Sequence, residues 1–267
     1  MEKNTLVKKE QCPNCAKLGK DKSKDNLAVY SDGQTHCYAC GEHGSVEHTN
    51  KPIQITEKED DSWKHEYRGG YYTLHDRKLR AETLERYKVK CEKDEKGRVI
   101  KHHYPFYNQK NNMVGMKTRM VASKSFFGKG DTTNQNMLFG QSLFQGGGKF
   151  VTVCEGELDA MSVYEMFGMR YASVSVNNGV HAIANIKANL EWLDSFETVV
   201  LCFDNDQAGR DSVEKVAPII GPNKCKILTL AKHKDASDYL KHGDGKEFLE
   251  EWWSYSKDYT VSGVATV

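Results

Sequence analysis

The sequence predicts an α/β protein: a small β zinc ribbon, a flexible linker, and a mixed α+β basic subdomain joined to a parallel-sheet domain. Three observations predict this fold class. Two Cys-x-x-Cys motifs lie within the first 40 residues, apolar runs at 150–153 and 198–202 each precede acidic residues, and helix-spaced apolar residues follow each run. Buried parallel strands have this continuous apolar character, and helices connect them.

Composition limits the class of protein. A chain of 267 residues holds one to three domains. It contains no apolar run long enough to span a membrane, and its charged N-terminus does not resemble a signal peptide. Eight cysteines without a secretory signal favour metal binding over disulfides. We therefore expect a cytoplasmic protein with no membrane partner.

The charge is distributed unevenly along the chain. Residues 1–149 contain 27 Lys and Arg against 19 Asp and Glu, whereas residues 150–267 contain 11 against 18. A basic half suits a polyanion and an acidic half suits bound cations. The alternative is that the surface charge is uneven without any such role.

The first 50 residues have the pattern of a zinc module. Cys12 and Cys15 form one knuckle, and Cys37 and Cys40 form the other. Four thiolates at this spacing make a closed, structural zinc site, although two disulfides or free thiols are the alternative. The segments 27–30 and 35–38 flank a Ser-Asp-Gly turn, which predicts a hairpin.

The polar, charged segment after the ribbon predicts a tether, because it has too little apolar surface to fold. A surface loop of one compact domain is the alternative. We expect a ribbon at 1–50, a linker at 51–63, a basic subdomain at 64–149, a catalytic sheet at 150–243, and a C-terminal helix and tail at 244–267.

The basic subdomain is predicted to contain a helix at 79–89 and a hairpin or meander at 99–120. Lys117 and Arg119 lie on the outgoing strand of this hairpin, and Lys124 follows in a loop. Together with Phe126 and Phe127, these side chains could hold phosphates and stack on bases. A solvated strand edge guarded by lysines is the alternative.

Acidic residues follow the strands of the predicted sheet. Glu155 follows the first strand, Asp204 and Asp206 follow a later one, and Asp235 comes after a last strand at 226–230. The carboxyl ends of parallel strands meet at one edge, where α/β sheets bind ligands. Converging carboxylates favour bound Mg²⁺, whereas the simpler interpretation is that the aspartates only cap helices.

These acidic residues resemble the Toprim signature, a Glu after one strand and Asp-x-Asp after a later one, shared by bacterial-type primases, topoisomerases and some nucleases. Three segments are similar to the primase half of T7-type bacteriophage DNA primase–helicases: Glu155-Gly156-Glu157-Leu158-Asp159, Phe203-Asp204-Asn205-Asp206-Gln207-Ala208-Gly209-Arg210 and Lys234-Asp235-Ala236-Ser237-Asp238.

The resemblance implies a DNA primase that makes short RNA primers on single-stranded DNA from ribonucleoside triphosphates. It implies one or two Mg²⁺ ions, or Mn²⁺, on Glu155, Asp204, Asp206 and Asp235, with Glu155 as a possible base. Glu157 and Asp159 would support this site. Nucleotide and template contacts would come from Lys117, Arg119 and Lys124 and, in the ribbon, from Asp32, Gln34 and His36, although Gln34 stands where the family has His.

The resemblance also implies partners. A replicative helicase, fused or separate, and a DNA polymerase would work with the primase in the cytoplasm of a bacterial host. Two alternatives stay open: a Toprim-type metal-dependent nuclease, and a non-catalytic zinc module that binds single-stranded DNA and a helicase.

Overall fold

The computed structural model describes residues 5–20, 24–45 and 61–260. The chain divides into two compact units, Met1–Glu59 and Asp60–Val267. Most of the linker predicted at 51–63 lies outside the described residues. Its last three residues form the start of a 3₁₀ helix, Asp61–Glu66, in which Trp63 is buried. None of the described helices combines the length and the hydrophobicity that crossing a bilayer requires.

The smaller unit is an antiparallel sheet with the strand order β1-β2-β3-β4. The elements are β1 Leu6–Glu10, α1 Pro13–Lys17, β2 Leu27–Tyr30, β3 Gln34–Cys37 and β4 His43–Ser45. Pairing of β2 with β3 confirms the predicted hairpin. The buried cluster of this unit consists of Cys12, Cys15 and Cys37 with Leu27 packed against it. So small an apolar core needs a further source of stability.

The first part of the larger unit contains a short helix, which is followed by a four-stranded antiparallel sheet in the order β5-β6-β7-β8. The elements are α2 Ala81–Arg86, β5 Lys90–Lys93, β6 Val99–Tyr107, β7 Met113–Met120 and β8 Phe126–Gly130. The predicted hairpin at 99–120 is confirmed as β6 and β7. The edge strand β8 was not predicted from sequence, and every residue in it is exposed.

A second sheet follows in the order β10-β9-β11-β12-β13. Its strands are β9 Phe150–Cys154, β10 Ala172–Ser175, β11 Thr198–Cys202, β12 Cys225–Ile227 and β13 Lys257–Asp258. The first four run parallel, as predicted, and β13 is antiparallel. The strand predicted at 226–230 ends early, at Ile227.

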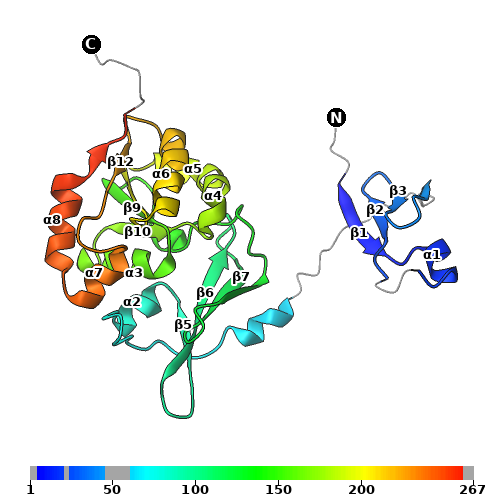
Figure 1. Cartoon of the computed structure of the whole chain (residues 1–267), viewed down its shortest axis with the longest axis horizontal. Helices are drawn as coiled ribbons and strands as arrows, with labels where there is room; N and C mark the ends of the chain where they lie inside the picture. Colours follow the sequence, from blue (N-terminus) through cyan, green and yellow to red (C-terminus); the bar gives the residue numbers. More distant parts are fainter. Residues whose placement is uncertain (1–4, 21–23, 46–60, 261–267) are drawn as a thin grey trace. The chain divides into compact units, whose positions relative to one another are not determined.

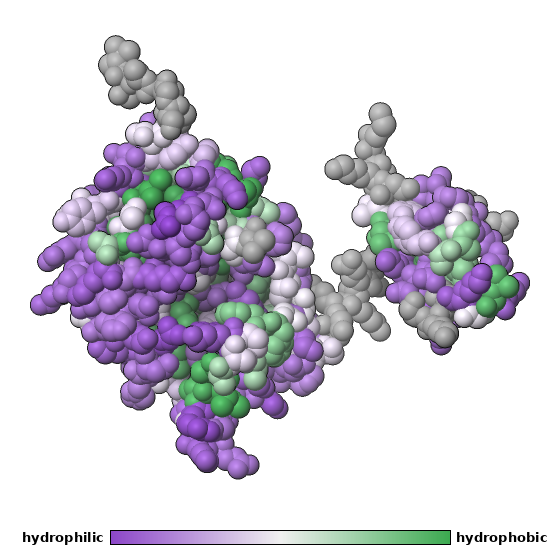
Figure 2. Space-filling view, viewed as in Figure 1, coloured by the Kyte–Doolittle hydropathy of each residue, from purple (hydrophilic) through white to green (hydrophobic). Residues whose placement is uncertain are grey.

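Helices cover both faces of the parallel sheet (Figure 1). One core cluster contains residues of α3 Glu157–Met166, α7 Ala236–His242 and α8 Gly245–Tyr255, and the other contains residues of α4 Ala182–Ala188, α5 Leu190–Asp194 and α6 Gln207–Ile220. The first cluster also contains Cys91 of β5 and Tyr104 of β6, together with Leu79, Leu84 and Tyr87 in and beside α2. The antiparallel and parallel sheets therefore share one core, and the visible surface of this unit is mostly hydrophilic (Figure 2).

Candidate active site and metal centre

The parallel strands end level with one another, which assembles the candidate site. Cys154 at the end of β9 pairs with Ser175 of β10 and with Cys202 of β11. The residues that follow these strands therefore meet at one edge of the sheet. They surround a cavity of about 410 Å³ lined by Lys117, Phe126, Glu155, Gly156, Glu157, Asp159, Asn177, Asn178, Gly179 and Asp204.

Glu155 lies at the centre of this edge. A Cβ atom on Gly179 would come within 2.8 Å of Glu155 Oε1, so a glycine there lets the loop after β10 approach the carboxylate. Glu155 Oε2 is buried and has no hydrogen-bond partner. Burial, followed by the negative charge of Asp204, raises the pKa of Glu155. A buried carboxylate oxygen without a donor is suited to a cation.

Lys234 lies between the two aspartates that follow β11. Its Nζ is 3.1 Å from Asp204 Oδ2 and 2.9 Å from Asp206 Oδ2. These contacts raise the pKa of Lys234, and burial raises the pKa of Asp204. Lys234 lies within the segment Lys234–Asp238 that resembles the family, but its sequence context does not indicate a role for it. No local pattern in the sequence reveals these contacts, because Lys234 lies 28 residues after Asp206 and 30 residues after Asp204.

Asp206 also caps a helix, since its Oδ1 accepts a hydrogen bond of 2.9 Å from the Gly209 amide at the start of α6. That bond and Lys234 lower the pKa of Asp206. Asp235 caps α7 in the same way, through the Asp238 amide at 2.8 Å. Asp206 and Asp235 thus each cap a helix through one carboxylate oxygen, while the second oxygen of Asp206 is paired with Lys234.

Asp159 adds a further buried acid behind this edge. Its Oδ1 accepts a hydrogen bond of 2.9 Å from the Ser237 amide. Burial, together with the carboxylates of Asp235 and Asp204, raises the pKa of Asp159 well above its usual value. Among the described residues, no three carboxylates have oxygens mutually within 4.8 Å. Two of the acids, Asp204 and Asp206, instead share the Lys234 ammonium.

The antiparallel sheet contributes the basic side chains. Lys117 forms an ion pair with Glu157 Oε1 and donates a 2.8 Å hydrogen bond to the Asn177 carbonyl. Arg119 Cζ is 5.9 Å from the centre of the exposed Phe126 ring, and Arg119 Nε is buried without a hydrogen-bond partner. Lys124 lies in the turn between β7 and β8 and does not line the cavity. The structure thus brings Lys117, but not Lys124, to the acids.

In the smaller unit, the four predicted cysteines form a cluster that could hold a metal ion. Their sulfur atoms lie within 4.8 Å of one another, with Cys12 Sγ 3.8 Å from Cys40 Sγ and Cys15 Sγ 3.7 Å from Cys37 Sγ. For metal–sulfur bonds of about 2.3 Å, a regular tetrahedron has edges of about 3.8 Å. The spacing therefore fits a tetrahedral metal site and is too long for disulfides.

The ribbon residues predicted to contact template lie on and beside one hairpin. Asp32 Oδ1 accepts a 2.9 Å hydrogen bond from the Gln34 amide. His36 has its ring centre 4.3 Å from that of His43 and 5.0 Å from that of the exposed Tyr38. Neither Tyr38 nor His43 is among the residues predicted to contact template. The hairpin register, which pairs His36 with His43, is the signal that identifies the cluster.

Comparisons with known proteins agree with this architecture. Residues 152–240 match the Toprim-like family. A DNA helicase/primase of Enterobacteria phage T3 is 30% identical over 254 residues, which cover 91% of this chain and 43% of the relative. The chain therefore spans less than half the length of this curated relative.

Two solved structures are similar over most of the chain. The primase fragment of the bacteriophage T7 primase-helicase is 28% identical with a TM-score of 0.63, covering 93% of this chain and 99% of that fragment. A chain from the structure of T7 lagging-strand DNA polymerase interacting with primase domains is 30% identical with a TM-score of 0.63, covering 71% of this chain and 93% of that chain. The chain therefore belongs to the family formed by the primase parts of T7-type bacteriophage primase–helicases, with a Toprim-like domain in its C-terminal half.

Proposed function

We propose that this chain is a DNA primase, which joins ribonucleoside triphosphates into short RNA primers on single-stranded DNA and releases pyrophosphate. The observation that supports this activity best is the cavity in which Glu155 and Asp204 face Lys117. Acidic groups can bind metal ions at such a site while basic groups bind phosphates, the combination that nucleotidyl transfer requires.

For the acidic edge, we propose that Glu155, Asp204, Asp206 and Asp235 bind one or two Mg²⁺ ions. The fit rests on oxygen ligands, on the unpartnered Glu155 Oε2, and on a cation, Lys234 Nζ, already held between two of the acids. When bound, the metal supplies stabilisation of the charge that develops on the reacting phosphate. Glu155, with its raised pKa, is also placed to accept the proton of an attacking 3′-hydroxyl.

Lys117, Arg119 and Lys124 have different roles in this proposal. Lys117 is held by Glu157 and the Asn177 carbonyl, so its ammonium keeps a defined position for a phosphate. Arg119 has an unused Nε and lies beside Phe126, which supports phosphate binding next to a stacked base. Lys124, exposed in its turn, would contact the template at a greater distance from the acids.

For the smaller unit, we propose that Cys12, Cys15, Cys37 and Cys40 bind one structural zinc ion and that Asp32, Gln34 and His36 contact template bases. A ribbon at 1–50 on a tether at 51–63 would deliver the template to the catalytic body at a raised effective concentration. A replicative helicase, fused or separate, and a DNA polymerase would be partners in the cytoplasm of a bacterial host.

The test is primer synthesis on single-stranded templates that cover all trinucleotides, with labelled nucleotides and Mg²⁺. We expect Asp204→Asn to lower the yield at least 100-fold, because the variant loses a metal-binding charge. Glu250→Gln, at an exposed position of α8, is the matched control and should keep full activity. Full activity of Asp204→Asn would refute the assignment, and shortening of labelled DNA without nucleotides would instead indicate a nuclease.

A further inference from the structure

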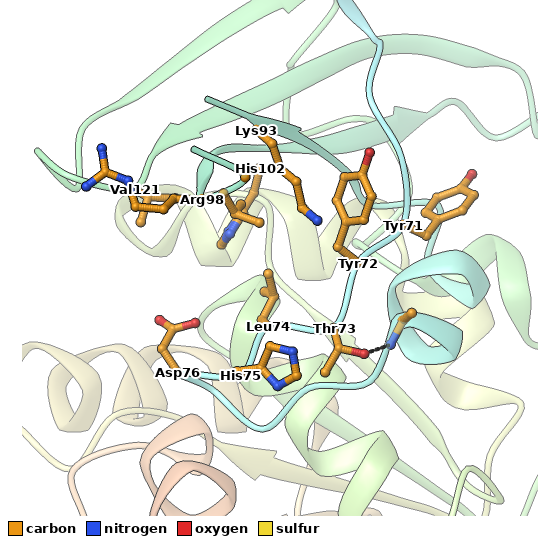
Figure 3. Close-up of a pocket in the computed structure, with 13 residues that line it drawn as sticks. Tyr71, Tyr72, Thr73, Leu74, His75, Asp76, Lys93, Arg98, His102 and Val121 are labelled. Carbon is orange, nitrogen blue, oxygen red and sulfur yellow. Dashed lines mark hydrogen bonds between the residues drawn. The ribbon is translucent and has the colours of Figure 1, made fainter. Parts of the chain in front are cut away.

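A second cavity, of about 570 Å³, lies in the larger unit outside the acidic site. Figure 3 shows side chains from the antiparallel sheet, among them Lys93 and His102, coming down toward the loop that carries Thr73, His75 and Asp76. We call it the tyrosine pocket, after Tyr71 and Tyr72 in its wall. None of the site residues predicted from sequence lines it, so the proposed primase chemistry leaves it unassigned.

Tyr72 is held in place by the chain on one side. The Gly70 amide donates a 3.1 Å hydrogen bond to the Cys91 carbonyl, which attaches this segment to β5. A Cβ atom on Gly70 would lie 2.8 Å from the Tyr72 ring, so the ring packs directly on the glycine backbone. The pocket therefore has a positioned aromatic wall.

A cation also lies against the Tyr72 ring. Lys93 Nζ is 3.7 Å from the centre of the Tyr72 ring. Within the described part of the chain, no acidic side chain forms an ion pair with Lys93, whereas Arg98 at the same rim is paired with Asp94 at 2.7 Å. An exposed contact between a cation and a ring is weak, so the Lys93 ammonium is available to an anion that enters the pocket.

His102 provides a neutral polar group in the pocket. It is only 4% exposed, and its Nδ1 is 3.0 Å from the Tyr104 hydroxyl. Burial, followed by the positive charge of Arg119, lowers the pKa of His102 to about 4. The ring is therefore uncharged at neutral pH and offers hydrogen bonding rather than charge.

The pocket adjoins the acidic site along one sheet face. His102 of β6 pairs with Arg119 of β7, and Tyr104 pairs with Lys117. Cross-strand pairs and alternate residues share a face, so Lys117, Arg119 and His102 project from the same side of the sheet. Lys93 lies on β5, where it pairs with Val99 of β6. Strands β5 and β7 are two strands apart, which corresponds to about 10 Å between their backbones.

We propose that the tyrosine pocket binds one nucleotide unit, with its phosphate on Lys93 and its base against Tyr72 and His102. The aromatic wall and the neutral hydrogen-bonding ring suit a base, and the cation that has no acidic partner suits the attached phosphate. The unit is either a free nucleotide or part of a single strand that reaches the acidic site past Arg119; only this second source rests on the proposed primase function.

Photocrosslinking in magnesium-free buffer tests the site by position rather than by activity. The two probes are 8-azidoadenosine 5′-monophosphate and a single-stranded oligodeoxynucleotide with one 8-azidoadenine, and labelled peptides are mapped by mass spectrometry. We expect label within residues 71–76 or 93–102. Labelling by the mononucleotide alone identifies a free-nucleotide site, and labelling by the oligonucleotide identifies a strand-binding site. The label should persist in Asp204→Asn, so loss of primer synthesis does not affect this test.

Affinity measurements on matched variants complete the test. We expect Lys93→Ala to weaken binding of the labelled probe about tenfold, as loss of a charged hydrogen bond does. Lys96→Ala removes the same charge three residues away, outside the pocket, and should change affinity less than twofold. Tyr72→Leu should also weaken binding while the melting temperature stays near that of the parent. Label found elsewhere with both probes, or equal losses in Lys93→Ala and Lys96→Ala, would overturn the proposal.

Discussion

The ion pair between Lys117 and Glu157 gives a prediction whose size follows from burial. The Lys117 side chain is 20% exposed and that of Glu157 is 7% exposed. Lys117→Met would leave the Glu157 carboxylate without its cation and the Asn177 carbonyl without its donor. Breaking a buried pair costs about 3–5 kcal/mol, and the partial exposure of Lys117 puts this pair at the lower end, about 3 kcal/mol.

Urea unfolding of four chains measures this coupling: the parent, Lys117→Met, Glu157→Gln and the double variant. Glu157→Gln keeps a hydrogen-bonding side chain beside Lys117, so we expect a loss of about 1 kcal/mol. The double variant has no buried charge at this position and should recover at least about 1.5 kcal/mol relative to Lys117→Met. For a unit of this size, 1 kcal/mol changes the melting temperature by about 2–4 °C.

Two results would refute this reasoning: a loss below about 0.5 kcal/mol in Lys117→Met, or strictly additive effects in the double variant. Primer synthesis separates stability from function. The double variant should regain stability but not activity, because the ammonium that we propose to bind phosphate is still missing.

Three further predictions concern the metal centre, a buried acid and a helix cap. Cys40→Ser should lower bound zinc, measured by elemental analysis, and unfold the smaller unit without changing the melting of the larger one. The pKa of Asp159 is higher in the folded protein than in the unfolded chain. The stability that this carboxyl group contributes therefore falls as pH rises above about 4, and it is fully lost above the folded-state pKa. In magnesium-free buffer, Asp159→Asn should therefore be more stable than the parent at pH 8, with a smaller difference at pH 5. Asp206→Ala should lose about 1 kcal/mol with the cap of α6, whereas Asp206→Asn should keep the cap and lose only activity.

Each of these predictions can fail clearly. Unchanged zinc content in Cys40→Ser would remove Cys40 from the ligand set. A stability difference between Asp159→Asn and the parent that does not depend on pH would mean that the buried carboxyl group is not the cause. Equal stability of Asp206→Ala and Asp206→Asn in urea unfolding would show that the Gly209 contact contributes nothing.

Local composition predicted the elements with strong patterns. The runs at 150–153 and 198–202 are the paired strands β9 and β11, and the cysteine knuckles form one cluster. Weak patterns failed for identifiable reasons. The helical spacing of Ala182, Ile186, Leu190 and Leu193 predicts one helix, but the structure has two, α4 and α5, which are divided at Asn189. The Asn189 side chain donates a 3.0 Å hydrogen bond to the Asn136 carbonyl, a tertiary contact that the spacing does not reveal. The edge strand β8 is exposed throughout, so it has no apolar alternation to detect.

The sequence by itself determined the fold class, the thiolate cluster and the placement of acids after parallel strands, because periodicity and spacing are local properties. Only the tertiary structure decided which side chains meet. Lys117 pairs with Glu157, Lys234 lies between Asp204 and Asp206, and Lys93 covers Tyr72. Such contacts depend on the order and register of the strands and on packing in the shared core, which spacing along the chain does not encode.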